Sequence, residues 1–192
     1  MFIASFLTFG FLFIIPVLLF YEVLREKNII KLLITITSLF LIYLVIYVVF
    51  NFNYLNSFRI ASSIENPEGF RLLSDPIDYF FTRLENIFEI LLFLGPFLTI
   101  LAFWGITILK KKSKDLFIIT ILGVSSLLAM FLTGAYKTGE TARACIFIYP
   151  FLMFPIAAYL ENRNIGFSEQ YQLSWLTFGQ AVLMQLFGFY FW

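Results

Sequence analysis

The sequence predicts an all-α integral membrane protein, a polytopic bundle of about six transmembrane helices. Of its 192 residues, 61% are hydrophobic and only 13% are charged, whereas about a quarter of a globular protein is charged. The charged residues leave six long gaps, at 1–21, 32–58, 90–109, 116–136, 144–160 and 170–192. Because about 20 apolar residues form a helix that crosses the hydrocarbon core of a bilayer, each gap is long enough for one span.

We place the spans at about 2–21, 32–52, 89–109, 116–135, 143–160 and 172–192. No repeat, low-complexity tract or linker divides the chain, so we expect a single membrane domain over residues 1–192. The first segment has no basic region before it, and we interpret it as a span rather than a removable signal. Because a polytopic protein seldom begins inside a hydrophobic helix, we also expect this chain to be the distal part of a longer protein.

Basic residues in the short loops predict the orientation, because they favour the cytoplasmic side of the membrane. They follow the first, third and fifth spans, as Arg25, Lys27, Lys31, Lys110, Lys111, Lys112, Lys114 and Arg163. Both termini and the two remaining connections, about 53–86 and 136–143, then lie outside; together these connections hold more acidic than basic residues. We expect a multi-pass protein of a bacterial-type plasma membrane.

The long outer connection carries its own helical signals. Ser74-Asp75-Pro76 places a capping side chain before a proline at the first helical position, so a helix should begin near residue 76. From Tyr79 apolar residues recur at helical spacing, with Thr82, Arg83, Glu85 and Asn86 between them. This pattern predicts an amphipathic interfacial helix that runs on into the third span.

Prolines and glutamines within the spans suggest how the helices bend and pack. Gly95-Pro96 in the third span, and Pro150 and Pro155 in the fifth, are expected to kink their helices. Interhelical hydrogen bonding is the expected role of the three glutamines of the sixth span, which are Gln172, Gln180 and Gln185.

The first candidate site is the segment of residues 138–143, TGETAR, just before the fifth span. Glu140 and Arg143 are three positions apart, so on a helix they share a face and can pair. If the fifth helix begins at residue 139 or 140, Thr138 can cap it, and its N-terminus with Arg143 forms an anion site suited to phosphate. The alternative is that Arg143 reaches lipid headgroups and Glu140 balances its charge.

The second candidate comprises Glu85 and Glu89, four positions apart at the entry to the third span. A carboxylate so near the hydrocarbon should face protein or water, which makes both candidate substrate contacts on the outer face. Alternatively they pair with Arg83 or with Lys137 of the neighbouring outer loop, or simply favour the start of a helix. Asp75 and Asp78 are explained more simply as cap and first-turn residues than as an acid/base pair.

Several functions are excluded by what the chain lacks. It has no histidine, which rules out histidine-based acid/base catalysis and catalytic triads. Its single cysteine, Cys145, rules out an intrachain disulfide and a multi-cysteine metal site. A net charge of +1 without a basic block gives no footprint for nucleic acid. We expect no metal and no other cofactor.

Residues 138–160, TGETARACIFIYPFLMFPIAAYL, resemble the late-helix motif of polytopic glycosyltransferases of the GT-C type. In that motif Gly-Glu-x-x-Arg opens a distal helix that continues as an aromatic, proline-containing run; the preceding outer connection is only loosely similar to a loop of such proteins. The resemblance implies an enzyme that transfers a sugar from a polyprenyl-phosphate donor to an acceptor on the extracytoplasmic face. It also implies that Arg143 and Glu140, with Thr138, lie where the donor phosphate or its sugar is held.

The chain departs from this family in its first loop. Family members use acidic residues of the first outer loop as the catalytic base, whereas here the first loop, YEVLREKNIIK, is short, basic and predicted to be cytoplasmic. The catalytic residue is therefore left unassigned. The simplest interpretation is a truncated or split form that needs the missing N-terminal half or another membrane subunit.

Two other classes of protein stay open. A transporter half needs polar groups at the centre of the bilayer, and the central turns of all six predicted spans lack charged residues, which counts against ion-coupled transport. A noncatalytic membrane scaffold or assembly subunit agrees with how little polar chemistry the chain carries.

Overall fold

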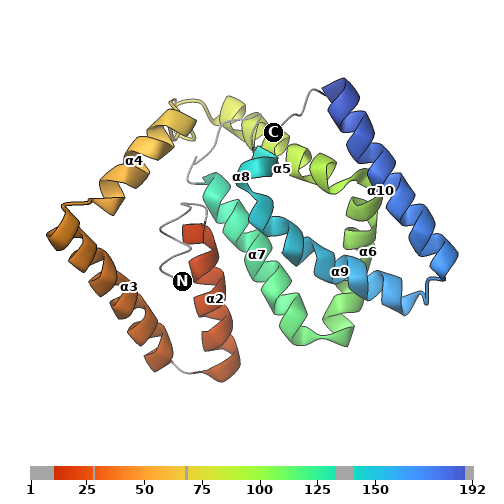
Figure 1. The fold of residues 1–192 in the computed structure, drawn as a ribbon, viewed down its shortest axis with the longest axis horizontal. Coiled ribbons are helices and arrows are strands. Elements are labelled where there is room, and N and C mark those ends of the chain that lie inside the picture. Colours follow the sequence, from red (N-terminus) through yellow and green to blue (C-terminus); the bar gives the residue numbers. More distant parts are fainter. Residues whose placement is uncertain (1–10, 28, 68, 133–140, 189–192) are drawn as a thin grey trace.

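The computed structural model describes residues 11–27, 29–67, 69–132 and 141–188, and within these ranges it contains helices and no strand (Figure 1). The all-α fold class is thereby confirmed. In chain order the elements are α2 (Phe11–Glu26), α3 (Ile29–Phe50), α4 (Tyr54–Glu65), α5 (Pro76–Leu94), α6 (Pro96–Lys112), α7 (Lys114–Leu132), α8 (Thr141–Ala144), the 3-10 turn η1 (Ile146–Ile148), α9 (Tyr149–Asn162) and α10 (Phe167–Gly188).

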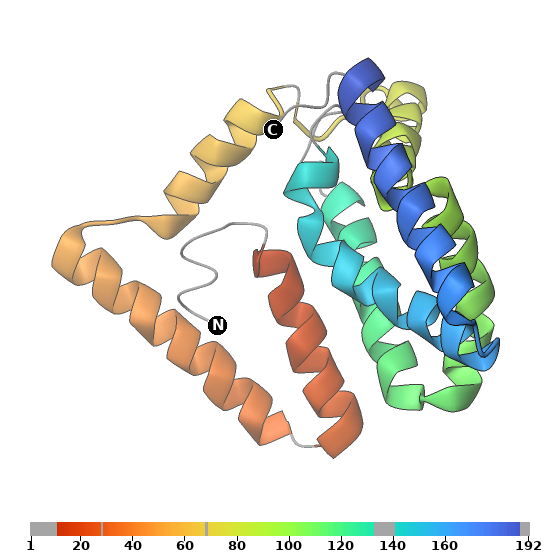
Figure 2. The ribbon, with the colours of Figure 1, turned by 45° about the vertical axis from the view of Figure 1, so that its right-hand side comes forward.

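The centre of the molecule is formed by α6, α7 and α9, and α2 packs on the side of α7 (Figures 1 and 2). Two glycines let α9 approach its neighbours. A Cβ atom at Gly105 would collide with the carbonyl oxygen of Pro155, and one at Gly123 would lie 2.6 Å from the ring of Phe151. Small residues at helix contacts are the usual means by which membrane helices come this close.

The three short turns between helices, α2 to α3, α6 to α7 and α9 to α10, share the lower side of the molecule in Figure 1. Two ion pairs join these turns. Arg25 Nη2 lies 4.0 Å from Asp115 Oδ2, and Lys112 pairs with Glu161 at the end of α9. The three loops that the sequence predicts to be cytoplasmic therefore lie together, as a single orientation in a membrane requires. We call this side the basic end, and the opposite side the α8 end.

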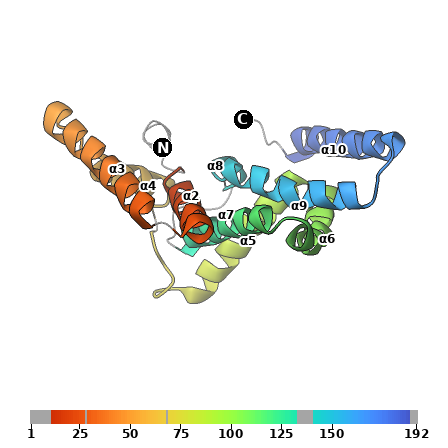
Figure 3. The ribbon, with the colours of Figure 1, turned by 90° about the horizontal axis from the view of Figure 1, so that it is seen from below.

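Two described helices, α3 and α7, are long and apolar enough to cross a membrane, and the number rises to three if the bent pair of α5 and α6 is one span. A shorter apolar helix covers Ile146–Asn162. These helices are compatible with a membrane protein. Seen from below, α3 and α10 lie at the two opposite edges of the molecule (Figure 3), and none of the residues of α3 is buried.

The predicted third span, 89–109, is divided between two helices. α5 ends at Leu94, α6 begins at Pro96, and the two helices meet at an angle of 100°. Gly95 stands at the corner with a φ of 102°, a conformation that costs glycine little because it has no Cβ. The bend expected at Gly95-Pro96 is confirmed, but the amphipathic helix does not run straight on. α5 lies across the α8 end while α6 runs along the bundle (Figure 1).

The predicted fifth span, 143–160, is divided as well. The short helix α8 ends at Ala144, and the 3-10 turn η1 follows before α9 begins. Pro150 has no N–H, so the carbonyl of Ile146 cannot form its usual α-helical bond and accepts from the N–H of Tyr149 instead. The proline thus explains why the chain tightens at this point.

Candidate functional site

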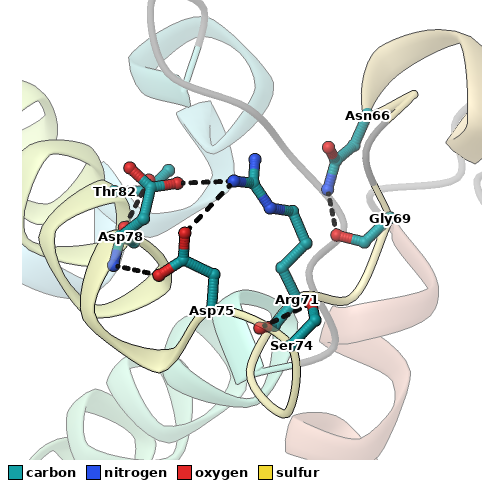
Figure 4. A network of polar contacts seen from close by, with 7 residues as sticks. All are labelled: Asn66, Gly69, Arg71, Ser74, Asp75, Asp78 and Thr82. Atoms are coloured by element: carbon teal, nitrogen blue, oxygen red, sulfur yellow. Dashed lines mark hydrogen bonds and ion pairs between the residues drawn. The ribbon is translucent and has the colours of Figure 1, made fainter.

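The start of α5 is fixed by a small polar network in the loop before it (Figure 4). Asp75 Oδ1 accepts a hydrogen bond of 3.2 Å from the N–H of Asp78, which confirms the predicted cap and the helix start at Pro76. Arg71 Nη2 lies 3.1 Å from Asp78 Oδ2 and 3.7 Å from Asp75 Oδ2. Both carboxylates are therefore held by an arginine at a helix N-terminus, where negative charge is stabilised.

One face of α5 turns inward and includes polar residues, whereas many of its large apolar residues point outward. Tyr79, Asn86, Ile90 and Leu94 are buried, whereas the exposed residues include Phe80, Phe81, Leu84 and Phe88. Such an arrangement is unfavourable in water but suits a helix whose outer face meets lipid. We use the name polar row for the four inward residues Tyr79, Arg83, Asn86 and Glu89.

Tyr79 attaches α5 to the end of α7. Its hydroxyl lies 2.6 Å from the carbonyl oxygen of Phe131 and 2.9 Å from that of Leu132, so its single proton is shared between them. These carbonyls belong to the last turn of α7, where the carbonyl groups of a helix have no backbone N–H of the same helix to accept from. The Arg83 guanidinium lies over the Tyr79 ring at 4.8 Å from the ring centre, a cation–π arrangement.

Asn86 and Glu89 attach α8 to the same helix. Asn86 Oδ1 accepts a hydrogen bond of 2.8 Å from the hydroxyl of Thr141, and both residues are fully buried. Glu89 Oε1 accepts a bond of 3.2 Å from the N–H of Ala142. One backbone donor of α8 that the sequence analysis made available to a phosphate is therefore taken by a carboxylate of the chain itself.

Within the part of the chain that the structure describes, three buried nitrogen atoms of the polar row have no hydrogen-bond partner: Nε and Nη1 of Arg83, and Nδ2 of Asn86. Leaving a buried donor unsatisfied costs stability, and the cost is larger for a charged group. Burial lowers the pKa of the Arg83 guanidinium, which nevertheless stays protonated at neutral pH because an arginine does not lose its proton in a protein. The polar row therefore presents unused donors and a positive charge.

The predicted site residues lie in different places in the structure. Glu89 belongs to the polar row, whereas Glu85 is exposed on another side of α5. Arg143 lies in α8, but its side chain is outside the described part of the structure. The remaining predicted residues, Thr138, Glu140 and Lys137, lie outside the described residues.

The sequence analysis missed Asn86 and Thr141, and it gave Arg83 only a pairing role. The signal was present, since Tyr79, Arg83, Asn86 and Ile90 are spaced at four, three and four positions and so share one helix face. In the amphipathic pattern, however, Arg83 and Asn86 are polar positions between the apolar ones, and such positions are typical of a solvent-facing side.

Comparison of the chain with protein-family models, with curated proteins and with solved structures gives no match.

Proposed function

We propose that the chain is a six-span membrane protein that acts on a phosphate-linked lipid sugar at the extracytoplasmic face, as the distal part of a GT-C-type glycosyltransferase. The hydrogen bond from the N–H of Ala142 to Glu89 Oε1 supports this proposal most directly. Ala142 belongs to the GT-C-like segment and Glu89 to the predicted set of outer carboxylates. The contact brings these two features, 53 positions apart, to one place at the α8 end.

In the proposed topology α2, α3, α6, α7, α9 and α10 cross the membrane, and α5 lies along its outer boundary. The positive-inside rule assigns the basic end to the cytoplasm, so the α8 end faces outward. The polyprenyl phosphate of such a donor has its phosphate at the membrane boundary and its chain in the hydrocarbon. The polar row and the exposed aromatic residues of α5 offer surroundings for these two parts of the molecule.

Arg143, Glu140 and Thr138 hold the donor phosphate or its sugar in this proposal, with Glu85 and Lys137 as further outer contacts. Asp75 and Asp78 are bound to Arg71, and Glu89 is bound to Ala142. Because these carboxylates already hold parts of the fold together, we assign the catalytic base to another chain or to the proposed N-terminal half of the enzyme.

The test is a transfer assay in membranes of cells that normally make the protein, with the gene deleted and then restored as variants. Release of polyprenyl phosphate is measured from a panel of polyprenyl-phosphate hexoses. Arg143→Ala and Glu140→Ala should each abolish the release that the wild-type chain restores. The matched control is Arg59→Ala on α4, an exposed arginine of the same outer connection. Unchanged release with Arg143→Ala would sink the assignment.

A second candidate, a noncatalytic assembly subunit, is favoured by α3. This helix has 22 residues, most of them apolar, and none of them is buried. Its exposed residues, which include Phe40, Val48 and Phe50, can meet a membrane partner or lipid. Single cysteines on the two faces of α3 in a Cys145→Ala chain distinguish the two. The subunit function would be supported if one face of α3 cross-links to another membrane protein and Arg143→Ala does not change sugar transfer. Cross-links to lipid alone would exclude it.

A further inference from the structure

We infer that Arg83 and Asn86 form a binding site for a phosphate group at the α8 end, separate from the residues that the GT-C resemblance implies. The inference deepens the proposed function and rests on it for the side of the membrane and for a lipid-linked source of the phosphate. Binding itself depends only on the side chains of the site.

The donors of the site are already in place. Arg83 Nε and Nη1 and Asn86 Nδ2 are buried and unpartnered. Arg83 and Asn86 are three positions apart on α5 and therefore on one face of it. Asn86 has no exposed surface, whereas Arg83 is half-buried and so reaches from the inner face toward the surface. The Tyr79 ring beneath the guanidinium fixes its plane.

The three carboxylates of α5 have other contacts or are exposed. Glu89 accepts from Ala142, Asp78 is paired with Arg71, and Glu85 is exposed. Two adjacent N–H donors of a guanidinium match two oxygens of a phosphate, and charge-assisted bonds of this kind are about twice as strong as neutral ones. An amide N–H such as Asn86 Nδ2 can bond a third oxygen. A phosphate bound here would offer oxygens to donors that have no partner among the described residues.

The surroundings of the site favour a phosphate carried on a lipid. Phe80, Phe81, Leu84 and Phe88 are exposed on the outer face of the same helix. A chain attached to a phosphate in the polar row can follow this apolar surface into the bilayer. Inorganic phosphate has the same headgroup chemistry but gains nothing from these side chains, so the two sources differ in affinity.

Binding is measured on the full chain in a maltoside detergent, which contains no phosphate, by the ligand-dependent rise of the unfolding temperature. The probes are inorganic phosphate, farnesyl phosphate and farnesol. Farnesol has the same hydrocarbon tail as farnesyl phosphate but no phosphate. We expect Arg83→Gln and Asn86→Asp each to lower the affinity for farnesyl phosphate by about tenfold to a hundredfold. A loss of this size corresponds to at least one charge-assisted hydrogen bond. Asn86→Asp keeps the oxygen that accepts from Thr141, and it replaces the amide donor by a carboxylate oxygen that also repels a phosphate. Arg59→Gln is the matched control.

A second measurement uses the wild-type protein and so does not depend on how the variants fold. Phenylglyoxal modifies arginines, and phosphate in the site should slow its reaction at Arg83 but leave Arg59 unchanged. Tighter binding of farnesyl phosphate than of inorganic phosphate identifies a lipid-linked ligand, and equal binding identifies free phosphate. Equal affinity in wild type and Arg83→Gln, or no protection of Arg83, would overturn the site. If phosphate protects Arg83 but Arg143→Ala does not change sugar transfer, the phosphate site is supported and the proposed enzyme function is rejected.

Discussion

The side-chain amide of Gln180, in α10, donates a hydrogen bond of 2.9 Å from Nε2 to the carbonyl oxygen of Leu92, in α5. In an unbroken helix this carbonyl would accept from residue 96, which is a proline and has no N–H. Lipid offers no donor to such a group, so a break in a membrane helix needs a replacement for the lost bond, such as a neighbouring side chain. Gln180 therefore stabilises the corner between α5 and α6, and the interhelical role predicted for it is confirmed.

Gln180→Leu should destabilise the protein by about 1 to 2 kcal/mol, because it leaves the Leu92 carbonyl without this donor. The measurement is thermal unfolding in detergent. Gln172→Leu provides the control, since Gln172 is exposed on the same helix and its replacement should have little effect. Equal losses in the two variants would show that the bond to Leu92 contributes nothing particular.

Gly95→Ala should also destabilise the corner. At a φ of 102° an alanine is strained by about 1 to 3 kcal/mol, and its Cβ would meet the Gln180 amide. Because the backbone strain is independent of that contact, the loss should persist when Gln180 is also replaced by alanine. Gly179→Ala, where a Cβ meets nothing within 4 Å, should instead stabilise α10 by about 0.5 to 1 kcal/mol. A Gly95→Ala variant as stable as wild type would contradict the described corner.

Thr141→Val should separate α8 from α5. It keeps the shape of the side chain but removes the hydroxyl that donates to Asn86 Oδ1, leaving a buried acceptor unsatisfied at a cost of about 1 to 3 kcal/mol. Thr141→Ser retains the hydroxyl and should lose much less. The two are compared by thermal unfolding and by proteolysis near α8. If valine and serine behave alike, the hydroxyl is not what holds α8.

The proposed orientation predicts which positions a membrane-impermeant maleimide reaches from outside the cell. In a Cys145→Ala background, a cysteine at Ser63 on α4 should be labelled in intact cells. A cysteine at Ser113, in the turn between α6 and α7, should be labelled only after the membrane is opened. A membrane-permeant maleimide checks that both positions react. Labelling of Ser113→Cys in intact cells would reverse the orientation and move the polar row to the cytoplasm.

Local features of the chain were predictable from the sequence because each depends on residues close to one another. The cap at Asp75, the helix start at Pro76 and the bend at Gly95 are set by neighbouring backbone groups. The common side of the basic turns follows from helices of similar length that reverse direction at each turn. The angle of the bend was not predictable, because the partners of α5, in α7, α8 and α10, are distant in the sequence.

Helical periodicity, hydropathy and turn residues already predict that the chain is helical and apolar enough for a membrane, where α5 begins, and where the helix breaks. Which face of α5 points inward follows from the packing, because an apolar face can be buried by protein or covered by lipid. The packing also decides the pairing of Asn86 with Thr141 and of Leu92 with Gln180, 55 and 88 positions apart. Helical periodicity shows which residues share a face, but not which distant face they meet; that is settled when the buried polar groups find partners.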